Sequence, residues 1–167
     1  MRRRRATNAP AAPTREAVAA APGRAPEGIR AGNGRFFFDL ASVNHIEAGP
    51  AYSTANGSLV SGERIMLGLM QMPKGTGARP HSHPNEQWIY VLEGTVDAEV
   101  DGVRSRAGPG TLVYVPANAV HRVVATPERD VVFLTAKDTS HGIWGTAADA
   151  SRYGPHYAPG HEPKKSG

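Results

Sequence analysis

The stretch GTGARPHSHPNEQWIYVLEGTVDAEVDGVRSRAGPGTLVYVPANAVH, residues 75–121, decides the fold and carries the candidate site. Short runs of alternating apolar and polar residues fill it, and turn-forming pairs that contain glycine, proline or asparagine separate them. Alternation with a period of two is typical of half-buried β-strands. Asp101-Gly102 lies between two such runs and predicts a tight two-residue hairpin. The stretch therefore predicts antiparallel β-structure.

The same pattern continues on both sides of this stretch, and no long helical periodicity interrupts it. We expect strands over residues 35–43, 64–72, 79–83, 87–92, 95–100, 103–107, 111–115, 120–126 and 130–136. The apolar run 64–72 is expected to be a strand buried on both faces. Short strands with this punctuation predict an all-β sandwich or barrel.

The 167 residues suggest one folded domain with two flanking segments. Residues 1–34 are rich in Ala, Pro and Arg and poor in aromatic residues, so we expect a disordered basic tail. Residues 35–140 are expected to form the barrel. Residues 141–167 lose the strand pattern, and we expect an irregular segment that packs on the barrel or frays.

The net charge of +4 comes from the tail, because residues 1–35 hold eight Arg and two Glu. The remaining residues are close to neutral, whereas a nucleic-acid-binding domain spreads Lys and Arg over a folded face. No apolar run approaches the ~18 residues of a membrane span. Arg2–Arg5 could begin a signal peptide, but prolines and charges between residues 10 and 16 break the apolar stretch that should follow. We expect a cytoplasmic protein with neither nucleic-acid nor membrane partners.

Three histidines and a glutamine form a candidate metal site. His81 and His83 are one residue apart on an expected strand, so both imidazoles point to the same side. Gln87 begins the next strand, and His121 follows the turn 116–118. Any one of these histidines alone would be an ordinary polar or core residue, but together the four side chains can meet inside one end of a barrel. A catalytic metal needs three or four protein ligands and an open position.

The spacing of these residues resembles the two motifs of the cupin superfamily. The first is GxxxxxHxHxxxQxxxxxxG at residues 75–94, and the second is GxxxxxPxNxxH at residues 110–121. The resemblance covers about residues 60–137. It implies a single jelly-roll β-barrel that holds one divalent metal ion and often assembles as a homodimer. Because the chain has no cysteine, Zn, Mn, Ni or Fe would be bound by His81, His83, Gln87 and His121.

Three residues depart from the family pattern, and one of them is Ala125, which takes the place of a usual Asn. Gln87 takes the place of the usual Glu ligand, and Asn118 takes the place of a turn glycine, which Asn can replace because it tolerates a left-handed conformation. Glu86 lies one position before Gln87 and is the alternative acidic ligand. Adjacent residues on a strand face opposite ways, so Gln87 facing inward would leave Glu86 outside or at the rim, where it could act catalytically.

The neutral ligand set has a chemical consequence. Three imidazoles and an amide leave a divalent ion with its full charge, which strengthens its Lewis acidity and favours a small anionic substrate such as a carboxylate, enolate or phenolate. Cupins with a Gln ligand that resemble this chain include sugar-acid isomerising enzymes, acid lyases and polyketide cyclases. We therefore expect a non-redox enzyme of the isomerase, cyclase or lyase type. An Fe(II)-dependent dioxygenase and a non-catalytic small-molecule-binding cupin are the alternatives.

Several residues that are not fixed positions of the motifs are further candidates for the site, an interface or a lid. Arg79 shares strand parity with His81 and either clamps a substrate carboxylate or lies at the barrel mouth. Trp88 and Tyr90 have the opposite parity to Gln87, so we expect them on the outer face or at a subunit interface. The remaining candidates are expected to be loop residues, with a lid over the mouth as the alternative: His141, Tyr153, His156, His161 and the segment 52–58.

Overall fold

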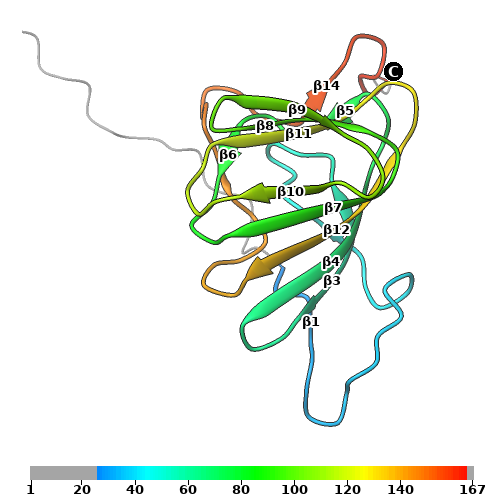
Figure 1. Cartoon of the computed structure of the whole chain (residues 1–167), viewed down its shortest axis with the longest axis vertical. Helices are drawn as coiled ribbons and strands as arrows, with labels where there is room; N and C mark the ends of the chain where they lie inside the picture. Colours follow the sequence, from blue (N-terminus) through cyan, green and yellow to red (C-terminus); the bar gives the residue numbers. More distant parts are fainter. Residues whose placement is uncertain (1–25, 165–167) are drawn as a thin grey trace, which may run out of the picture.

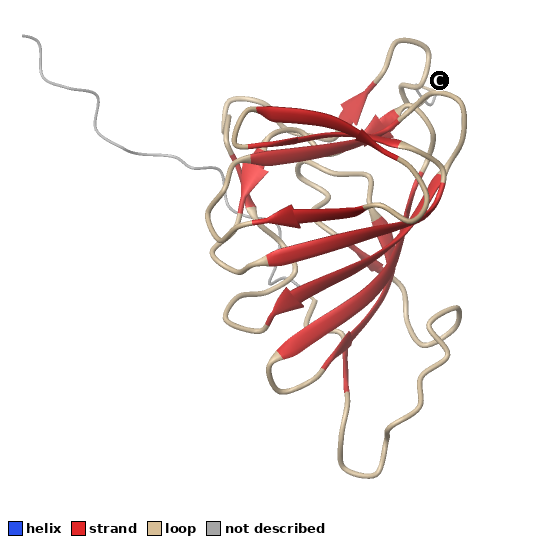
Figure 2. Ribbon diagram, in the orientation of Figure 1, coloured by secondary structure: helices blue, strands red, loops and turns tan. Residues whose placement is uncertain are grey.

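The chain folds into strands that face each other in two layers (Figures 1 and 2). The structure is a computed structural model that describes residues 26–164. Within this range it contains no helix, and hence none that could cross a membrane. Most of the expected tail falls on residues 1–25, which lie outside the described residues. The strands are β1 Ile29–Arg30, β2 Ile46–Glu47, β3 Asn56–Ser61, β4 Ile65–Met72, β5 Thr76–Gly77, β6 His81–Ser82, β7 Gln87–Glu93, β8 Val96–Val100, β9 Val103–Ala107, β10 Leu112–Val115, β11 His121–Ala125, β12 Val131–Asp138, β13 Thr146–Ala147 and β14 His156–Tyr157.

The two layers form a jelly-roll β-barrel (Figure 1). The first sheet has the order β1-β3-β4-β12-β7-β10, and β2 pairs with β3. The second has the order β13-β6-β11-β5-β14, and β8 connects β11 to β9. Strands far apart in the sequence lie side by side, as β4 does with β12. The predicted all-β barrel is therefore confirmed.

The core lies between the two sheets and follows the period of two. In β12 buried and partly buried residues alternate without a break. Strand β4 also alternates, with Met66 and Met70 inside but Ile65 60% exposed. The prediction that residues 64–72 are buried on both faces is therefore wrong. Loop residues 36–45 lie against part of the outer side of this sheet but leave Ile65 and Leu67 exposed, so full burial is confined to the inward positions.

The predicted hairpin at Asp101-Gly102 is confirmed. Both residues have positive φ, 46° and 80°, which is the requirement of a type I′ turn. Val100 and Val103 pair directly across it, so β8 and β9 are held in register. This hairpin lies in the sheet that also carries His81 and His121.

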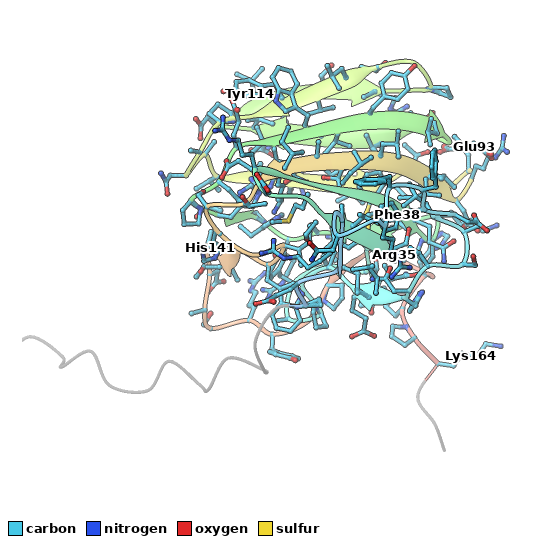
Figure 3. The ribbon with its side chains drawn as sticks, turned by 90° about the horizontal axis from the view of Figure 1, so that it is seen from below. Arg35, Phe38, Glu93, Tyr114, His141 and Lys164 are labelled. Carbon is cyan, nitrogen blue, oxygen red and sulfur yellow. The ribbon has the colours of Figure 1, made fainter. Side chains whose placement is uncertain are left out.

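The predicted strand over residues 35–43 is wrong. This segment belongs to the loop that extends away from the barrel between β1 and β2 (Figure 1), and Phe37 is 93% exposed. Asp39 accepts hydrogen bonds from the Ala41 amide and the Ser42 hydroxyl, which form a local turn instead of a strand. The Arg35 guanidinium lies 5.1 Å from the centre of the Phe38 ring (Figure 3). Three consecutive phenylalanines give no inside–outside alternation, so no sheet face selects them.

The chain before and after the barrel also contributes strands. Within the range 1–34 assigned to the tail, Ile29 and Arg30 form β1 and pair in parallel with β3. After β12 the chain turns back over the second sheet, where β13 pairs with β6 and β14 pairs with β5. These short strands place the C-terminal segment beside the strands that carry the histidines.

Candidate metal centre

The candidate site begins with two histidines on neighbouring strands. His81 in β6 and His121 in β11 are direct cross-strand partners, so their imidazoles project from the same side of the sheet. His83 follows two residues after His81 and shares its parity. The amide of Asn118 donates to the His83 carbonyl over 2.8 Å. Asn118 has a φ of 64°, so the left-handed turn expected at this position is present and ties the second motif to the first.

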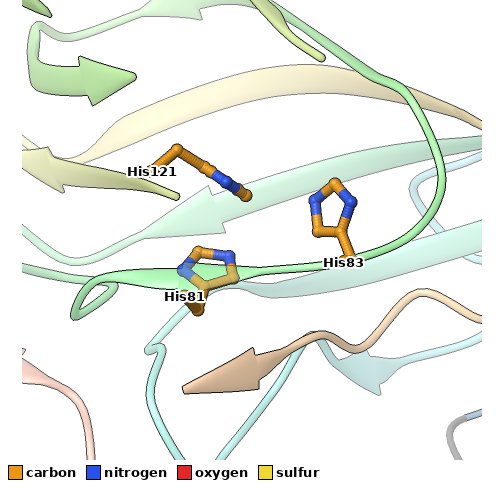
Figure 4. Close-up of side chains that lie close together, drawn as sticks. All are labelled: His81, His83 and His121. Carbon is orange, nitrogen blue, oxygen red and sulfur yellow. The ribbon is translucent and has the colours of Figure 1, made fainter. Parts of the chain in front are cut away.

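The three imidazoles point toward a common centre (Figure 4). One ring nitrogen from each of His81, His83 and His121 lies within 4.8 Å of the other two. The ring centroids are 4.1 Å apart for His81 and His121 and 4.8 Å apart for His83 and His121. All three side chains are buried. The three histidines could therefore hold a metal ion.

Hydrogen bonds to the backbone orient all three rings. Each Nδ1 lies 2.7–3.0 Å from a carbonyl oxygen, namely those of Arg79, Asn85 and Ala119 for His81, His83 and His121 respectively. A carbonyl oxygen can only accept, so each Nδ1 carries the proton. Each Nε2 then has its lone pair free, as a metal ligand requires.

Gln87 lies inside the barrel beside His83, and its contacts fit a bound cation. Its amide nitrogen donates to the Thr135 hydroxyl over 2.8 Å, which turns Oε1 toward Nε2 of His83, also at 2.8 Å. With Nδ1 protonated, Nε2 of a neutral His83 can only accept. Two lone pairs then face each other inside the protein, an arrangement that a positive ion between the donors would stabilise.

Burial keeps the imidazoles neutral, which metal binding requires. It lowers the pKa of His81 well below its ordinary value, and a charge on His121 would lower it further. It lowers the pKa of His121 to about 4. Burial followed by the charge of Lys137 lowers the pKa of His83.

A cavity of about 50 Å³ opens directly beside this centre. Its apolar wall comes from both sheets and includes Met70, Ile89 and Phe133. Its polar wall consists of Tyr52, Ser53, His81, Gln87, His121, Thr135 and Lys137. The metal centre thus forms one side of a small cavity with several hydrogen-bonding groups.

Two polar residues on this wall, Lys137 and Tyr52, were not predicted to line the site. Lys137 is buried at the end of β12, and its Nζ donates to the Ile143 carbonyl over 2.9 Å. Strand parity could have indicated its inward position, because Phe133, Thr135 and Lys137 alternate along one strand and all face inward. The predicted strand, however, ended at residue 136. The sequence predicted Tyr52 only as part of a lid. No local sequence pattern indicates that it lines the site, because contacts between distant segments bring it there.

Tyr52 connects the metal centre to the C-terminal segment. Its ring stacks on His81 with 4.3 Å between centroids. Its hydroxyl accepts a hydrogen bond from the Gly145 amide over 2.7 Å. Burial raises the pKa of Tyr52 to about 12, so the group is a neutral phenol near neutral pH.

The two proposed catalytic side chains lie outside the cavity wall. The Arg79 guanidinium donates to the carbonyls of Ala51, Arg152 and Gly154 and so joins two chain segments. Glu86 accepts a 2.6 Å hydrogen bond from the Tyr114 hydroxyl on the outer face, which raises the pKa of that phenol. Of the two candidate fourth ligands, the fold therefore brings Gln87 to the histidines and turns Glu86 away from them.

The C-terminal histidines are scattered over the covering segment. His141 and Tyr153 are exposed, and His156 pairs with Gly77 through β14. The His161 ring lies against Gly75, where an added Cβ would come within 2.4 Å of it. None of these four side chains lines the cavity beside the metal centre.

Residues 68–137, which include the three histidines and Gln87, match the family described as Cupin domain. The chain carries a cupin domain. The resemblance inferred from the two motifs is therefore confirmed, and the barrel that surrounds the histidines is the cupin barrel. The match ends at Lys137, so the segment that covers the cavity lies beyond it.

One curated relative of this cupin is the dimethylsulfoniopropionate lyase DddW of Ruegeria pomeroyi. The two proteins are 33% identical over 73 residues, which is 44% of this chain and 48% of the relative. The match thus spans about half the length of that lyase.

Two solved cupin structures are similar in fold. KdgF from Halomonas sp. has a TM-score of 0.55 and 22% identity, over 63% of this chain and 94% of that one. The polyketide cyclase RemF from Streptomyces resistomycificus has a TM-score of 0.53 and 23% identity, over 61% and 78%. At these identities the likeness establishes the shared barrel alone.

Proposed function

We propose that this cupin is a metal-dependent lyase that acts on a small carboxylate. The observation that carries the proposal is the cluster of three buried imidazoles with the Gln87 amide oxygen beside a small cavity that has both polar and apolar walls. His81, His83 and His121 would hold the ion with Gln87. When bound, a divalent ion supplies Lewis-acid stabilisation of negative charge on a substrate oxygen.

The neutral ligands favour an anionic substrate. Histidine and glutamine contribute no negative charge, so the ion would keep both of its positive charges in a buried site. Within the described chain, no carboxylate lines the cavity. An anionic group of the substrate would therefore supply the missing negative charge.

Tyr52 is placed to hold a proton during the reaction. Its oxygen already accepts from the Gly145 amide, so its own O–H is free to donate to a substrate oxygen in the cavity. Its raised pKa keeps the proton on the phenol at neutral pH, and the stacking on His81 fixes the ring beside the metal centre. A hydrogen bond from this group would strengthen as negative charge develops on the substrate.

The relative suggests the substrate class. Dimethylsulfoniopropionate carries a carboxylate and, two carbons away, a sulfonium that can leave. A lyase of this class transfers a proton from the carbon next to the carboxylate to a base. The electrons of that C–H bond form the C=C bond of acrylate, and dimethyl sulfide departs with the electrons of the broken C–S bond. The cavity of about 50 Å³ favours a small substrate.

Product release from dimethylsulfoniopropionate tests the proposal. The protein, loaded separately with Zn, Mn, Ni or Fe(II), should release dimethyl sulfide, measured by headspace gas chromatography, together with equimolar acrylate. His121→Ala treated in the same way is the control and should be inactive. Failure with all four ions, and no exchange of the substrate's α-protons in D₂O, would indicate a non-catalytic binding protein. Oxygen uptake with the iron form would instead favour the dioxygenase.

A further inference from the structure

Lys137 is a buried cationic side chain on the wall of the metal-site cavity. It lies directly across from Gln87 in the neighbouring strand and shares the inward parity of Thr135. The residue is only 4% exposed. It lines the same cavity as His81, Gln87 and His121, so its side chain lies beside the metal centre.

The amine of Lys137 has unused hydrogen-bonding capacity. An ammonium group has three N–H donors, and within residues 26–164 the contact recorded for it is the bond to the Ile143 carbonyl. No carboxylate in that range forms an ion pair with it. The next residue, Asp138, has its carboxylate turned to the amides of Glu86 and Ser140. Buried lysines are rare unless paired, so this group lacks its counter-charge.

We propose that Lys137 is the residue that selects a carboxylate substrate, by donating hydrogen bonds from its ammonium group to the carboxylate inside the cavity. The proposal deepens the proposed function and rests on it for the choice of substrate class. The Ile143 carbonyl would hold Nζ in place while the two remaining N–H groups contact the anion. A carboxylate would compensate the charge that protonation places on this buried amine, whereas a neutral analogue of the same shape would not and would bind more weakly.

The test compares one charged and one neutral ligand of equal size. Propionate and propionamide differ in charge but hardly in shape. Their affinities for the zinc-loaded protein and for zinc-loaded Lys137→Met are measured by NMR titration. The wild-type protein should prefer propionate, and Lys137→Met should weaken propionate binding about 10–100-fold while propionamide binding changes less than about 3-fold. Met keeps the length of the side chain, and zinc content measured on both proteins checks that the metal centre is intact.

A chemical rescue separates the charge from packing. Because the chain has no cysteine, Lys137→Cys can be alkylated selectively with 2-bromoethylamine under unfolding conditions and then refolded. The product carries an amine at nearly the position of Nζ and should regain the preference for propionate. Equal weakening of both ligands in Lys137→Met, an unchanged preference, or no rescue would overturn the proposal. These are binding measurements, so they can succeed even if the lyase assay fails.

Discussion

At the end of strands β7 and β12 that lies beside the histidines, the two faces of the sheet carry opposite kinds of side chain, whereas the inner face further along is apolar. The inner face presents Gln87, Thr135 and Lys137, which are buried and polar. The outer face presents Trp88 and Tyr90, each 41% exposed although aromatic. A sheet with one face in water usually shows the reverse distribution. The inversion suggests that the inner polar groups serve a ligand and that the outer apolar groups serve a partner.

The buried polar side chains of the inner face form hydrogen bonds with one another and with the backbone. Gln87 contacts Thr135 and His83, and the Lys137 amine donates to the Ile143 carbonyl. On the outer face, the Trp88 and Tyr114 rings lie 4.5 Å apart, and Leu112 extends the apolar surface. Substitutions on either face test this difference, and the expected effects decrease in the order that follows.

The largest effect is expected from removing a histidine. His83→Ala and His121→Ala should each weaken zinc binding about 100–1000-fold, because a site with three or four protein ligands loses one of them. Metal content after dialysis, measured by mass spectrometry, checks this. Ser82→Ala is the matched control, since Ser82 lies between His81 and His83 with the opposite parity. Wild-type zinc content in both histidine variants would show that the metal binds elsewhere.

Replacing the buried amine should stabilise the metal-free protein. Burial lowers the pKa of Lys137 from 10.5 to about 7. Between these values the unfolded chain holds one proton more than the folded chain, so the free energy of unfolding falls as the pH is lowered toward 7. Lys137→Met removes this dependence and should be more stable by on the order of 1–4 kcal/mol at pH 7.

The measurement is urea unfolding of both proteins, without metal, at pH 7 and at about pH 10. Other groups that titrate contribute equally to both proteins, so only the difference between them is informative. This difference should be smaller at the higher pH. A variant that is less stable at pH 7 would show that the Lys137 amine contributes more through its bond to Ile143 than its burial costs.

Substitutions of the adjacent residues Gln87 and Glu86 should have different effects on metal affinity, because the two side chains lie on opposite faces of the sheet. Gln87→Ala should weaken zinc binding about tenfold, because it removes the proposed ligand oxygen, which also faces His83. Glu86→Gln should leave zinc affinity unchanged, because Glu86 bonds Tyr114 outside the barrel. Competition with a chelator of known affinity measures both. The opposite result would identify Glu86 as the ligand.

An effect no larger than this is expected on the outer face, where we propose that two copies of this chain associate. Trp88→Ala should weaken the dimer about tenfold, since a central aromatic side chain commonly dominates such interfaces. Light scattering after size-exclusion chromatography, over a range of protein concentrations, measures the shift to monomer. Ser105→Ala, on an exposed strand of the other sheet, is the control. A wild-type protein that is monomeric at all concentrations would contradict the proposal.

Residue spacing predicted the centre of this molecule better than its edges. The hairpin at Asp101-Gly102 and the strands around the histidines followed from local patterns, because turns and period-two alternation depend on neighbouring residues. The segment 35–43 was predicted wrongly, since apolar content alone favoured a strand there, but no sheet edge accepts it. The apolar run 64–72 was predicted as a strand, yet its outer half is exposed because a second layer covers only one face.

Strand parity and the two turn motifs were enough to predict that His81, His83, Gln87 and His121 converge, because both are local properties of the chain. The surroundings of these residues depend on the assembled barrel. It carried Tyr52 onto His81 from far earlier in the sequence, placed Lys137 across from Gln87, and joined both to the segment 143–145. Such contacts depend on which strands become neighbours in the barrel, and the free energy that selects those neighbours comes from burying the whole core.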